Sequence, residues 1–207
     1  MIRSPFIAGL ILLLLSLQAL AEPQRILVVG DSLSAAYGMA QEEGWVSLLQ
    51  QRLRDKGKDF VVINASITGD TTRGALARLP AALQRHQPNL VIIELGGNDG
   101  LRGFRPADLR ENLRKLVDLS RAQGAQVLLL GVQLPANYGP TYRRKFHAVY
   151  AEVAESTQSA LVPFFLEGVA ENLALMQADG IHPAAQAQAR ILDNVWPGLL
   201  PLLQAPD

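Results

Sequence analysis

The sequence contains no cysteine, which excludes a disulfide framework, a thiolate metal site and a cysteine nucleophile. It also lacks an excess of either charge, because 19 basic and 19 acidic residues give a formal net charge of +0 at pH 7. Without a basic stripe, we expect no nucleic-acid partner. Histidine is scarce as well, since His86, His147 and His182 are the 3 in a chain of 207 residues. Chemistry that needs an imidazole must therefore use one of these positions.

The chain has one long apolar run, Phe6 to Leu17, and no second run of that length follows it. Arg3 precedes the run and Ala19-Leu20-Ala21 follows it, which is the layout of a secretory signal peptide. The run is shorter than the about 20 residues that a membrane-spanning helix needs. We therefore expect a signal peptide at 1–21 and one domain at 22–207 without a stable membrane anchor. An uncleaved anchor is the alternative.

Export favours a bacterial periplasm, with secretion into the medium as the alternative. A lipoprotein anchor is excluded because there is no cysteine to acylate. We expect the mature protein to be a monomer.

Short runs rich in leucine and β-branched residues divide the chain, and most are continuously apolar, the pattern of strands buried on both faces of a parallel sheet. The expected strands are Arg25–Val29, Phe60–Asn64, Leu90–Glu94, Gln126–Leu130 and Ala160–Val162. Segments with helical spacing alternate with them: Trp45–Lys56, Gly74–Arg85, Pro106–Gln123, Tyr142–Ser159 and Ala184–Leu200, the last bent or ended near Pro197. This alternation predicts βαβ units with right-handed crossovers. We expect an α/β fold, a three-layer α/β/α sandwich with a mostly parallel five-stranded sheet in flavodoxin-like order.

Polar and glycine residues follow each of the first four expected strands. Gly30-Asp31-Ser32-Leu33-Ser34 follows the first, residues 65–70 the second, 95–99 the third and 133–138 the fourth. Ligands of such sheets bind beyond the carboxyl ends of the strands. We therefore expect these segments to build one site together.

The segment Asp179-Gly180-Ile181-His182-Pro183 carries a carboxylate and an imidazole three positions apart. Side chains at this spacing on one turn lie about 5–6 Å apart at Cβ and can meet. An aspartate that binds one imidazole nitrogen fixes the tautomer of the histidine and stabilises its protonated form. His86 and His147 have no acidic residue at a matching spacing, so His182 is the expected general base. A polar loop that leads into a helix at Pro183 is the alternative.

Ser32 is the best candidate for a nucleophile. It follows a buried strand at the expected start of a helical turn, where free backbone N–H groups favour developing negative charge. An N-cap serine is the alternative. Ser34 and Ser66 lack the preceding Gly-Asp turn and are weaker candidates.

Gly69 and Asn98 are candidate oxyanion donors. The backbone N–H of Gly69 can approach a substrate closely because no Cβ intervenes, and the Asn98 amide offers two N–H groups. A turn glycine and an asparagine that closes a tight loop are the alternatives.

Three aspartates, Asp31, Asp70 and Asp99, gather at the same expected edge. They have no second histidine nearby and no recognisable ligand spacing, so we expect turn and supporting roles and no metal site. Asn137 and Tyr138 are expected at the mouth of the pocket, with simple loop packing as the alternative.

Four blocks of the sequence resemble those of the SGNH (GDSL) hydrolase family, in order and at suitable separations: Gly30-Asp31-Ser32-Leu33-Ser34, the Gly69 segment, Gly96-Gly97-Asn98-Asp99 and Asp179-Gly180-Ile181-His182. The likeness extends through NASITGDTTRGALARLP, ELGGNDGLRGF and LPANYG, so it covers most of the mature chain. The resemblance implies Ser32 as nucleophile, His182 as base and Asp179 as its partner. It also implies an oxyanion hole made by the Ser32 and Gly69 N–H groups and the Asn98 side chain.

The resemblance further implies an exported serine esterase that forms an acyl-enzyme and needs no metal or organic cofactor. Its implied small-molecule substrates are acyl esters and thioesters, among them lysophospholipids, aryl and alkyl esters and acyl-CoA-type thioesters. An acyl chain needs an apolar groove, for which we expect Leu76 and Leu79 on one wall, although core packing explains these leucines equally well. Asp31, Asn137 and Tyr138 are the further substrate contacts that we expect.

Two other functions remain open from the sequence. The first is a short-acyl esterase or carbohydrate O-deacetylase that uses the same site. The second is a non-enzymatic binding module that holds a phosphate at the Gly30–Ser34 turn; such a module has no need of the Asp179–His182 pair.

Overall fold

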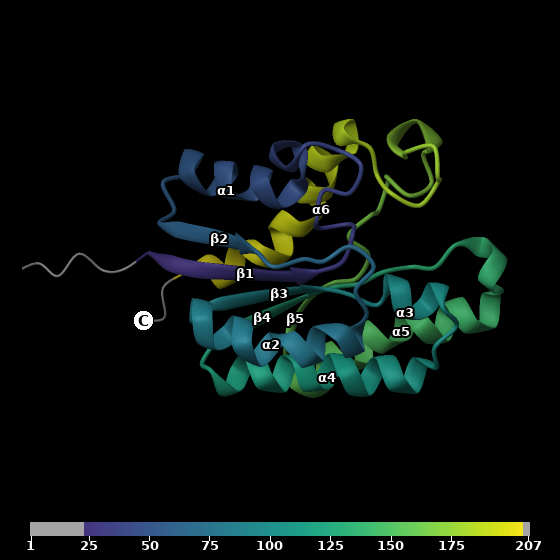
Figure 1. Ribbon diagram of the computed structural model, residues 1–207, viewed down its shortest axis with the longest axis horizontal. Helices are drawn as coiled ribbons and strands as arrows, with labels where there is room; N and C mark the ends of the chain where they lie inside the picture. Colours follow the sequence, from purple (N-terminus) through teal and green to yellow (C-terminus); the bar gives the residue numbers. More distant parts are fainter. Residues whose placement is uncertain (1–22, 205–207) are drawn as a thin grey trace, which may run out of the picture.

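A five-stranded parallel sheet forms the centre of the molecule (Figure 1), in a computed structural model that describes residues 23–204. The strands are β1 (Gln24–Gly30), β2 (Phe60–Asn64), β3 (Leu90–Glu94), β4 (Gln126–Leu130) and β5 (Ala160–Val162). Their order is β2-β1-β3-β4-β5 with every neighbouring pair parallel, which confirms the flavodoxin-like order. β1 is longer than expected because Gln24 pairs with Phe60 of β2 and Gly30 pairs with Glu94 of β3.

The strands alternate with α-helices, and most helices lie where the hydrophobic spacing predicts them. They are α1 (Trp45–Asp55), α2 (Thr72–His86), α3 (Gly97–Leu101), α4 (Pro106–Ala122), α5 (Pro140–Thr157) and α6 (Gln188–Leu199). α2 begins before the expected Gly74 because Thr71 caps it, with Oγ1 accepting from the Gly74 N–H at 3.2 Å. α5 begins at Pro140 rather than Tyr142, since a proline without an N–H is tolerated in the first turn.

Two helical segments differ from the expectation. The expected helix Ala184–Leu200 is α-helical only over α6, and short 3-10 helices at Ala185–Ala187 and Leu200–Leu203 precede and follow it. α3 was not predicted, because five residues with two glycines carry no helical periodicity.

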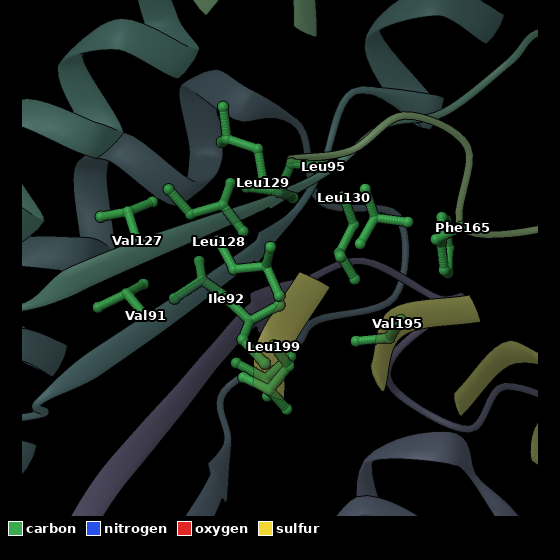
Figure 2. Packing of buried hydrophobic residues seen from close by; sticks show 14 of the residues in the cluster. Val91, Ile92, Leu95, Val127, Leu128, Leu129, Leu130, Phe165, Val195 and Leu199 are labelled. Atoms are coloured by element: carbon green, nitrogen blue, oxygen red, sulfur yellow. The ribbon is translucent and has the colours of Figure 1, made fainter. Parts of the chain in front are cut away.

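The helices cover both faces of the sheet and complete the three layers that the sequence predicts. α1 and α6 lie on one face, and α2, α4 and α5 lie on the other (Figure 1). Ile92 and Leu128 are register neighbours on β3 and β4 and are fully buried. Figure 2 shows Ile92 and Leu128 on the side of the sheet that faces Leu199 of α6. Burial of such side chains stabilises the fold by about 1.5–3 kcal/mol each.

The carboxyl ends of the strands point toward the side of the molecule where α3 lies (Figure 1). The loops after β1, β2, β3 and β4 emerge there, so the fold brings together the segments that the sequence predicts for one site. The expected signal peptide at 1–21 lies outside the described residues. Within residues 23–204, no helix has the length and apolar character that a membrane crossing requires.

Candidate active site

Ser32 lies on a tight turn directly after β1. The turn is held by a hydrogen bond from the Ala35 N–H to the Asp31 carbonyl at 3.0 Å and by another from the Leu33 N–H to Asp31 Oδ1 at 3.0 Å. Residues 32–38 form turns rather than a regular helix, so Ser32 is not the N-cap of a helix as the alternative interpretation required. Its own N–H makes no hydrogen bond with any residue from 23 to 204.

A chain of two hydrogen bonds joins Ser32 to the segment that precedes α6. His182 Nε2 lies 2.8 Å from Ser32 Oγ, and His182 Nδ1 lies 2.6 Å from Asp179 Oδ2. An ionised carboxylate only accepts hydrogen bonds, so Nδ1 carries the proton in this arrangement. Nε2 is then left to accept from the Ser32 hydroxyl, which is the geometry that a general base needs.

Asp179 is held by the backbone of its own loop. Its Oδ1 accepts from the His182 N–H at 3.0 Å and from the Ile181 N–H at 2.9 Å. These bonds, together with the one from the His182 ring, lower the pKa of Asp179 to about 2, the His182 N–H having the largest effect. The Asp179 carboxylate is therefore charged at neutral pH.

A narrow loop carries both residues. Met176 and Pro183 form an antiparallel bridge, and the Gln177 N–H donates to the His182 carbonyl at 2.7 Å. Gly180 turns the chain with φ of 65°, a conformation that favours glycine. The loop thus fixes the Asp179–His182 spacing without being helical.

Tyr37 covers the outer face of the imidazole and was not singled out from the sequence. Its ring lies 4.3 Å from the His182 ring, centroid to centroid, with the planes tilted by 39°. Gln177 Nε2 donates to the Tyr37 carbonyl at 2.7 Å and ties the two loops together. No motif or periodicity in the sequence indicated this contact.

Asn98 lies on α3 and borders the same cavity as Ser32 and His182. One of its amide hydrogens is donated to Asp31 Oδ2 at 3.0 Å, so the second remains available. The chain reaches α3 through Gly96, whose φ of 117° is a glycine conformation. A Cβ at this position would also collide with the Tyr150 hydroxyl.

Gly69 lies in the loop after β2 with φ of 78°, and no heavy atom lies within 4 Å of the place where a Cβ would be. Its N–H makes no hydrogen bond with any residue of the described part of the chain, while its carbonyl accepts from Arg102 Nη2 at 3.0 Å. Gly69 does not line the cavity that holds Ser32.

The three aspartates of the expected edge have separate partners. Asp31 binds Asn98, Asp70 pairs with Arg78 at 2.8 Å, and Asp99 accepts from the N–H of Thr72 at 3.0 Å. Among residues 23–204, no three histidine or acidic side chains are arranged to hold a metal ion.

Glu94 is a buried carboxyl group beneath the Ser32 turn that sequence reasoning missed. It ends β3, is 0% exposed, and accepts from the Ser34 hydroxyl at 2.8 Å and from the Asp31 N–H at 3.3 Å, both at Oε2. Burial, and then the Asp31 charge, raise the pKa of Glu94 well above its usual range. A glutamate that ends an otherwise apolar strand was the signal in the sequence.

A cavity of about 410 Å³ opens beside Ser32. Its apolar wall comes from the segments after β4 and β5, including Val132, Leu134, Pro135, Phe164, Leu166 and Met176. Arg143 and Glu171 are charged residues on the lining, and Asp31 borders it although it is only 1% exposed.

Four expected substrate contacts do not line this cavity. Leu79 is fully buried in the core and Leu76 packs against it, so the core-packing alternative describes both. Asn137 is exposed, and the Tyr138 hydroxyl donates to the Leu101 carbonyl at 2.9 Å. Leucines at helical spacing form one apolar face of a helix. The sequence alone does not distinguish a face that packs against the sheet from a face that lines a ligand groove.

The chain belongs to the GDSL-like lipase/acylhydrolase family, whose sequence model matches residues 28–190. The family resemblance inferred from the four blocks is therefore confirmed, and the chain is an enzyme of the ester-hydrolase class.

Relatives with ester-hydrolase names are similar to this chain over most of its length. Esterase TesA of Pseudomonas aeruginosa is 59% identical over 202 residues, which is 97% of this chain and 100% of that protein. The thioesterase 1/protease 1/lysophospholipase L1 of Escherichia coli strain K12 is 45% identical over 194 residues, 94% of this chain and 91% of that protein. A crystal structure of TesA matches with a TM-score of 0.85 and 61% identity, covering 86% of this chain and 99% of that chain.

Proposed function

We propose that this hydrolase cleaves acyl esters and thioesters through an acyl-enzyme on Ser32. The proposal rests on one observation, the two hydrogen bonds that connect three side chains. His182 Nε2 lies 2.8 Å from Ser32 Oγ, and His182 Nδ1 lies 2.6 Å from Asp179 Oδ2. His182 Nε2 takes the hydroxyl proton as Ser32 Oγ attacks the acyl carbonyl, and Asp179 stabilises the imidazolium that forms. The same proton then passes to the departing alkoxide or thiolate.

Water completes the cycle by the reverse sequence. His182 takes a proton from a water molecule, the hydroxide attacks the acyl carbonyl, and the bond to Ser32 Oγ breaks. Ser32 recovers the proton from His182, and the carboxylic acid leaves. Each step conserves protons between Ser32, His182 and the substrate, so no cofactor is required.

The tetrahedral intermediates need hydrogen-bond donors at the oxyanion. The N–H groups of Ser32 and Gly69 have no partner among residues 23–204, and Asn98 has one amide hydrogen to spare. We assign these three groups as the oxyanion hole. Loss of one such donor typically costs on the order of 10²–10³ in turnover, about 3–4 kcal/mol.

The apolar wall of the cavity supports an acyl chain as the ligand. A phosphate-binding module has no use for that wall. Lysophospholipids, aryl and alkyl esters and acyl-CoA-type thioesters are the substrates that we propose. Hydrolysis of p-nitrophenyl esters of increasing chain length tests this, because a short-acyl esterase or O-deacetylase would prefer acetate.

We also propose that residues 1–21 direct export and that the single domain at 22–207 works as a periplasmic monomer. In that compartment lysophospholipids and exogenous esters are the available substrates, and thioesterase activity is a capability rather than the role. Cell fractionation with N-terminal sequencing tests the cleavage. Lysophospholipid turnover in periplasmic extracts with and without the protein tests the substrate, and equal turnover contradicts it.

Labelling with a fluorophosphonate followed by mass spectrometry tests the nucleophile. We expect the label on Ser32, and neither label nor activity in Ser32→Ala. Ser156→Ala is the matched control, since Ser156 bonds only the Val153 carbonyl of its own helix. A label on another residue, or full activity in Ser32→Ala, overturns the mechanism.

A further inference from the structure

Two carboxyl groups are buried side by side behind the nucleophile, and the mechanism above uses neither. Asp31 is 1% exposed and Glu94 is 0% exposed. They are close because Gly30, the last residue of β1, pairs in register with Glu94 of β3, and Asp31 directly follows Gly30. The Asp31 N–H donates to Glu94 Oε2 at 3.3 Å, so the two groups are in direct contact.

The hydrogen-bond donors around the pair are divided unevenly. Asp31 accepts at both oxygens, from the Leu33 N–H at Oδ1 and from Asn98 Nδ2 at Oδ2, each at 3.0 Å. Glu94 Oε2 accepts from Asp31 and Ser34, but Glu94 Oε1 has no donor among residues 23–204. A buried carboxylate oxygen without a donor is costly, whereas the hydroxyl oxygen of a protonated carboxyl needs an acceptor instead.

We propose that Glu94 is a positioning residue whose Oε1 carries a proton and donates it to the Asp31 carboxylate, so that Asp31 in turn aims the Asn98 amide at the oxyanion. Glu94 stays neutral and Asp31 stays charged, so one negative charge rather than two lies behind the site. The role of Asn98 as an oxyanion donor rests on the proposed function, but the protonation of Glu94 does not.

The groups around Asp31 favour a charged Asp31 and a protonated Glu94. Burial raises the pKa of Asp31 to about 6, while its bonds to Leu33 and Asn98 and the nearby His182 oppose the rise. Those same donors stabilise the charged form of Asp31, which makes Glu94 the holder of the proton at neutral pH.

The remaining titratable groups supply no compensating cation. Tyr150 of α5 donates to the Leu95 carbonyl, and burial raises its pKa well above its usual range, so it stays a neutral phenol. Arg78 of α2 binds Asp70 and the Ala65 carbonyl, and its Nη2 reaches the Gly30 carbonyl at 3.5 Å rather than either carboxyl. Among residues 23–204 no basic side chain forms a salt bridge with Asp31 or Glu94, so two charged carboxylates here would repel each other.

The expected consequence appears in turnover rather than in substrate binding. Asn98 acts on the charge that develops in the transition state, so an Asn98 amide that is aimed less well lowers kcat and leaves KM nearly unchanged. Glu94→Gln keeps an oxygen for Ser34 and Asp31 and supplies an N–H where the proposed proton lies. Glu94→Leu removes both.

The experiment combines infrared spectroscopy with kinetics on p-nitrophenyl acetate. At pH 7 we expect a protonated-carboxyl band in the wild-type spectrum that disappears in Glu94→Gln. We expect Glu94→Leu to lower kcat about tenfold or more with KM changed by less than about threefold, and Glu94→Gln to recover most of that kcat. Ser120→Ala is the control for lost stability, because Ser120 is fully buried on α4 and bonds only the Leu116 carbonyl.

The proposal is overturned if the wild-type protein shows no such band, if the band persists in Glu94→Gln, or if Glu94→Gln loses as much kcat as Glu94→Leu. If Glu94→Leu does not fold, two measurements still test the proposal: the infrared band, and the kcat of Glu94→Gln relative to the wild-type enzyme. A tenfold or greater loss of kcat in Glu94→Gln counts against the proposal. Activity that survives in Ser32→Ala would refute the proposed function and leave the band unchanged, so the two failures are distinguishable.

Discussion

Replacing Asp179 with asparagine tests the catalytic role of the carboxylate with little change of shape. Asparagine can keep its oxygen at the Oδ1 position, where Asp179 accepts from the N–H groups of Ile181 and His182 at 2.9 and 3.0 Å. Its NH₂ group then faces His182 Nδ1, which lies 2.6 Å from Oδ2. Two N–H donors cannot bond each other, so the imidazole must move its proton to Nε2. That tautomer donates to Ser32 Oγ and cannot take its proton.

The size of the expected activity loss in Asp179→Asn follows from this change of tautomer. The same substitution in a serine-protease triad lowers kcat by about 10⁴, which corresponds to roughly 5.5 kcal/mol. The Asp179 side chain is 39% exposed, so water can relieve part of the mismatch. We therefore expect Asp179→Asn to lose about 10³–10⁴ in kcat/KM.

The assay is p-nitrophenyl ester hydrolysis at pH 7, with thermal melting and fluorophosphonate labelling of the same samples. We expect slow labelling and a Tm close to that of the wild-type protein, because both backbone bonds remain. Asp179→Ala is the comparison: it forces no tautomer but leaves two N–H groups of the loop to water, so its Tm should fall by about 2–4 °C for each 1 kcal/mol lost. An Asp179→Asn enzyme within tenfold of wild type would refute the tautomer argument.

Three further predictions concern the oxyanion donor, the buried pair and the cavity. Asn98→Ala should lower kcat by about 10²–10³ with little change in KM, measured by steady-state kinetics, and an unchanged kcat removes Asn98 from the oxyanion hole. The pKa of Asp31 is raised from 3.8 to about 6, so the folded state holds the proton more tightly than the unfolded state and stability is lost as pH rises through about 6. The free energy of unfolding of the wild type relative to Asp31→Asn should therefore fall by roughly 2–3 kcal/mol between pH 4 and pH 7 in urea titrations, whereas a rise contradicts the burial argument. Phe164→Ala should lower kcat/KM for long-chain p-nitrophenyl esters more than for acetate, and an equal loss on both places Phe164 outside the acyl path.

The sheet could be predicted from the sequence because most of its strands are continuous apolar runs. The helix ends that differ from the expectation lie where capping residues set them. Thr71 and Pro140 set the starts of α2 and α5, and neither belongs to the apolar pattern that predicts the helices. The His182–Asp179 contact was also predictable, because both residues lie on one short loop.

The cavity wall could not be predicted for a physical reason. Leu134, Phe164 and Met176 come from segments without regular periodicity, and the path of the backbone alone brings them beside Ser32. Leu76 and Leu79 are spaced one helical turn apart and therefore face the core. The contact of Tyr37 with His182 likewise depends on how two loops cross.

The position of Glu94 is a consequence of strand register. Gly30 and Glu94 are parallel neighbours, so the last residue of β3 lies under the first residues after β1. A Cβ at Gly30 would lie 2.8 Å from the Ser34 Cβ and 2.8 Å from Ser66 Oγ, so glycine is what allows the turn to fold back over the strand end. That close approach puts the Ser34 hydroxyl within 2.8 Å of Glu94 and holds the carboxyl away from water. The Ser32 turn and the buried Glu94 are thus parts of one arrangement, because the glycine that lets the chain turn at Ser32 also creates the dry space in which we propose that Glu94 retains its proton.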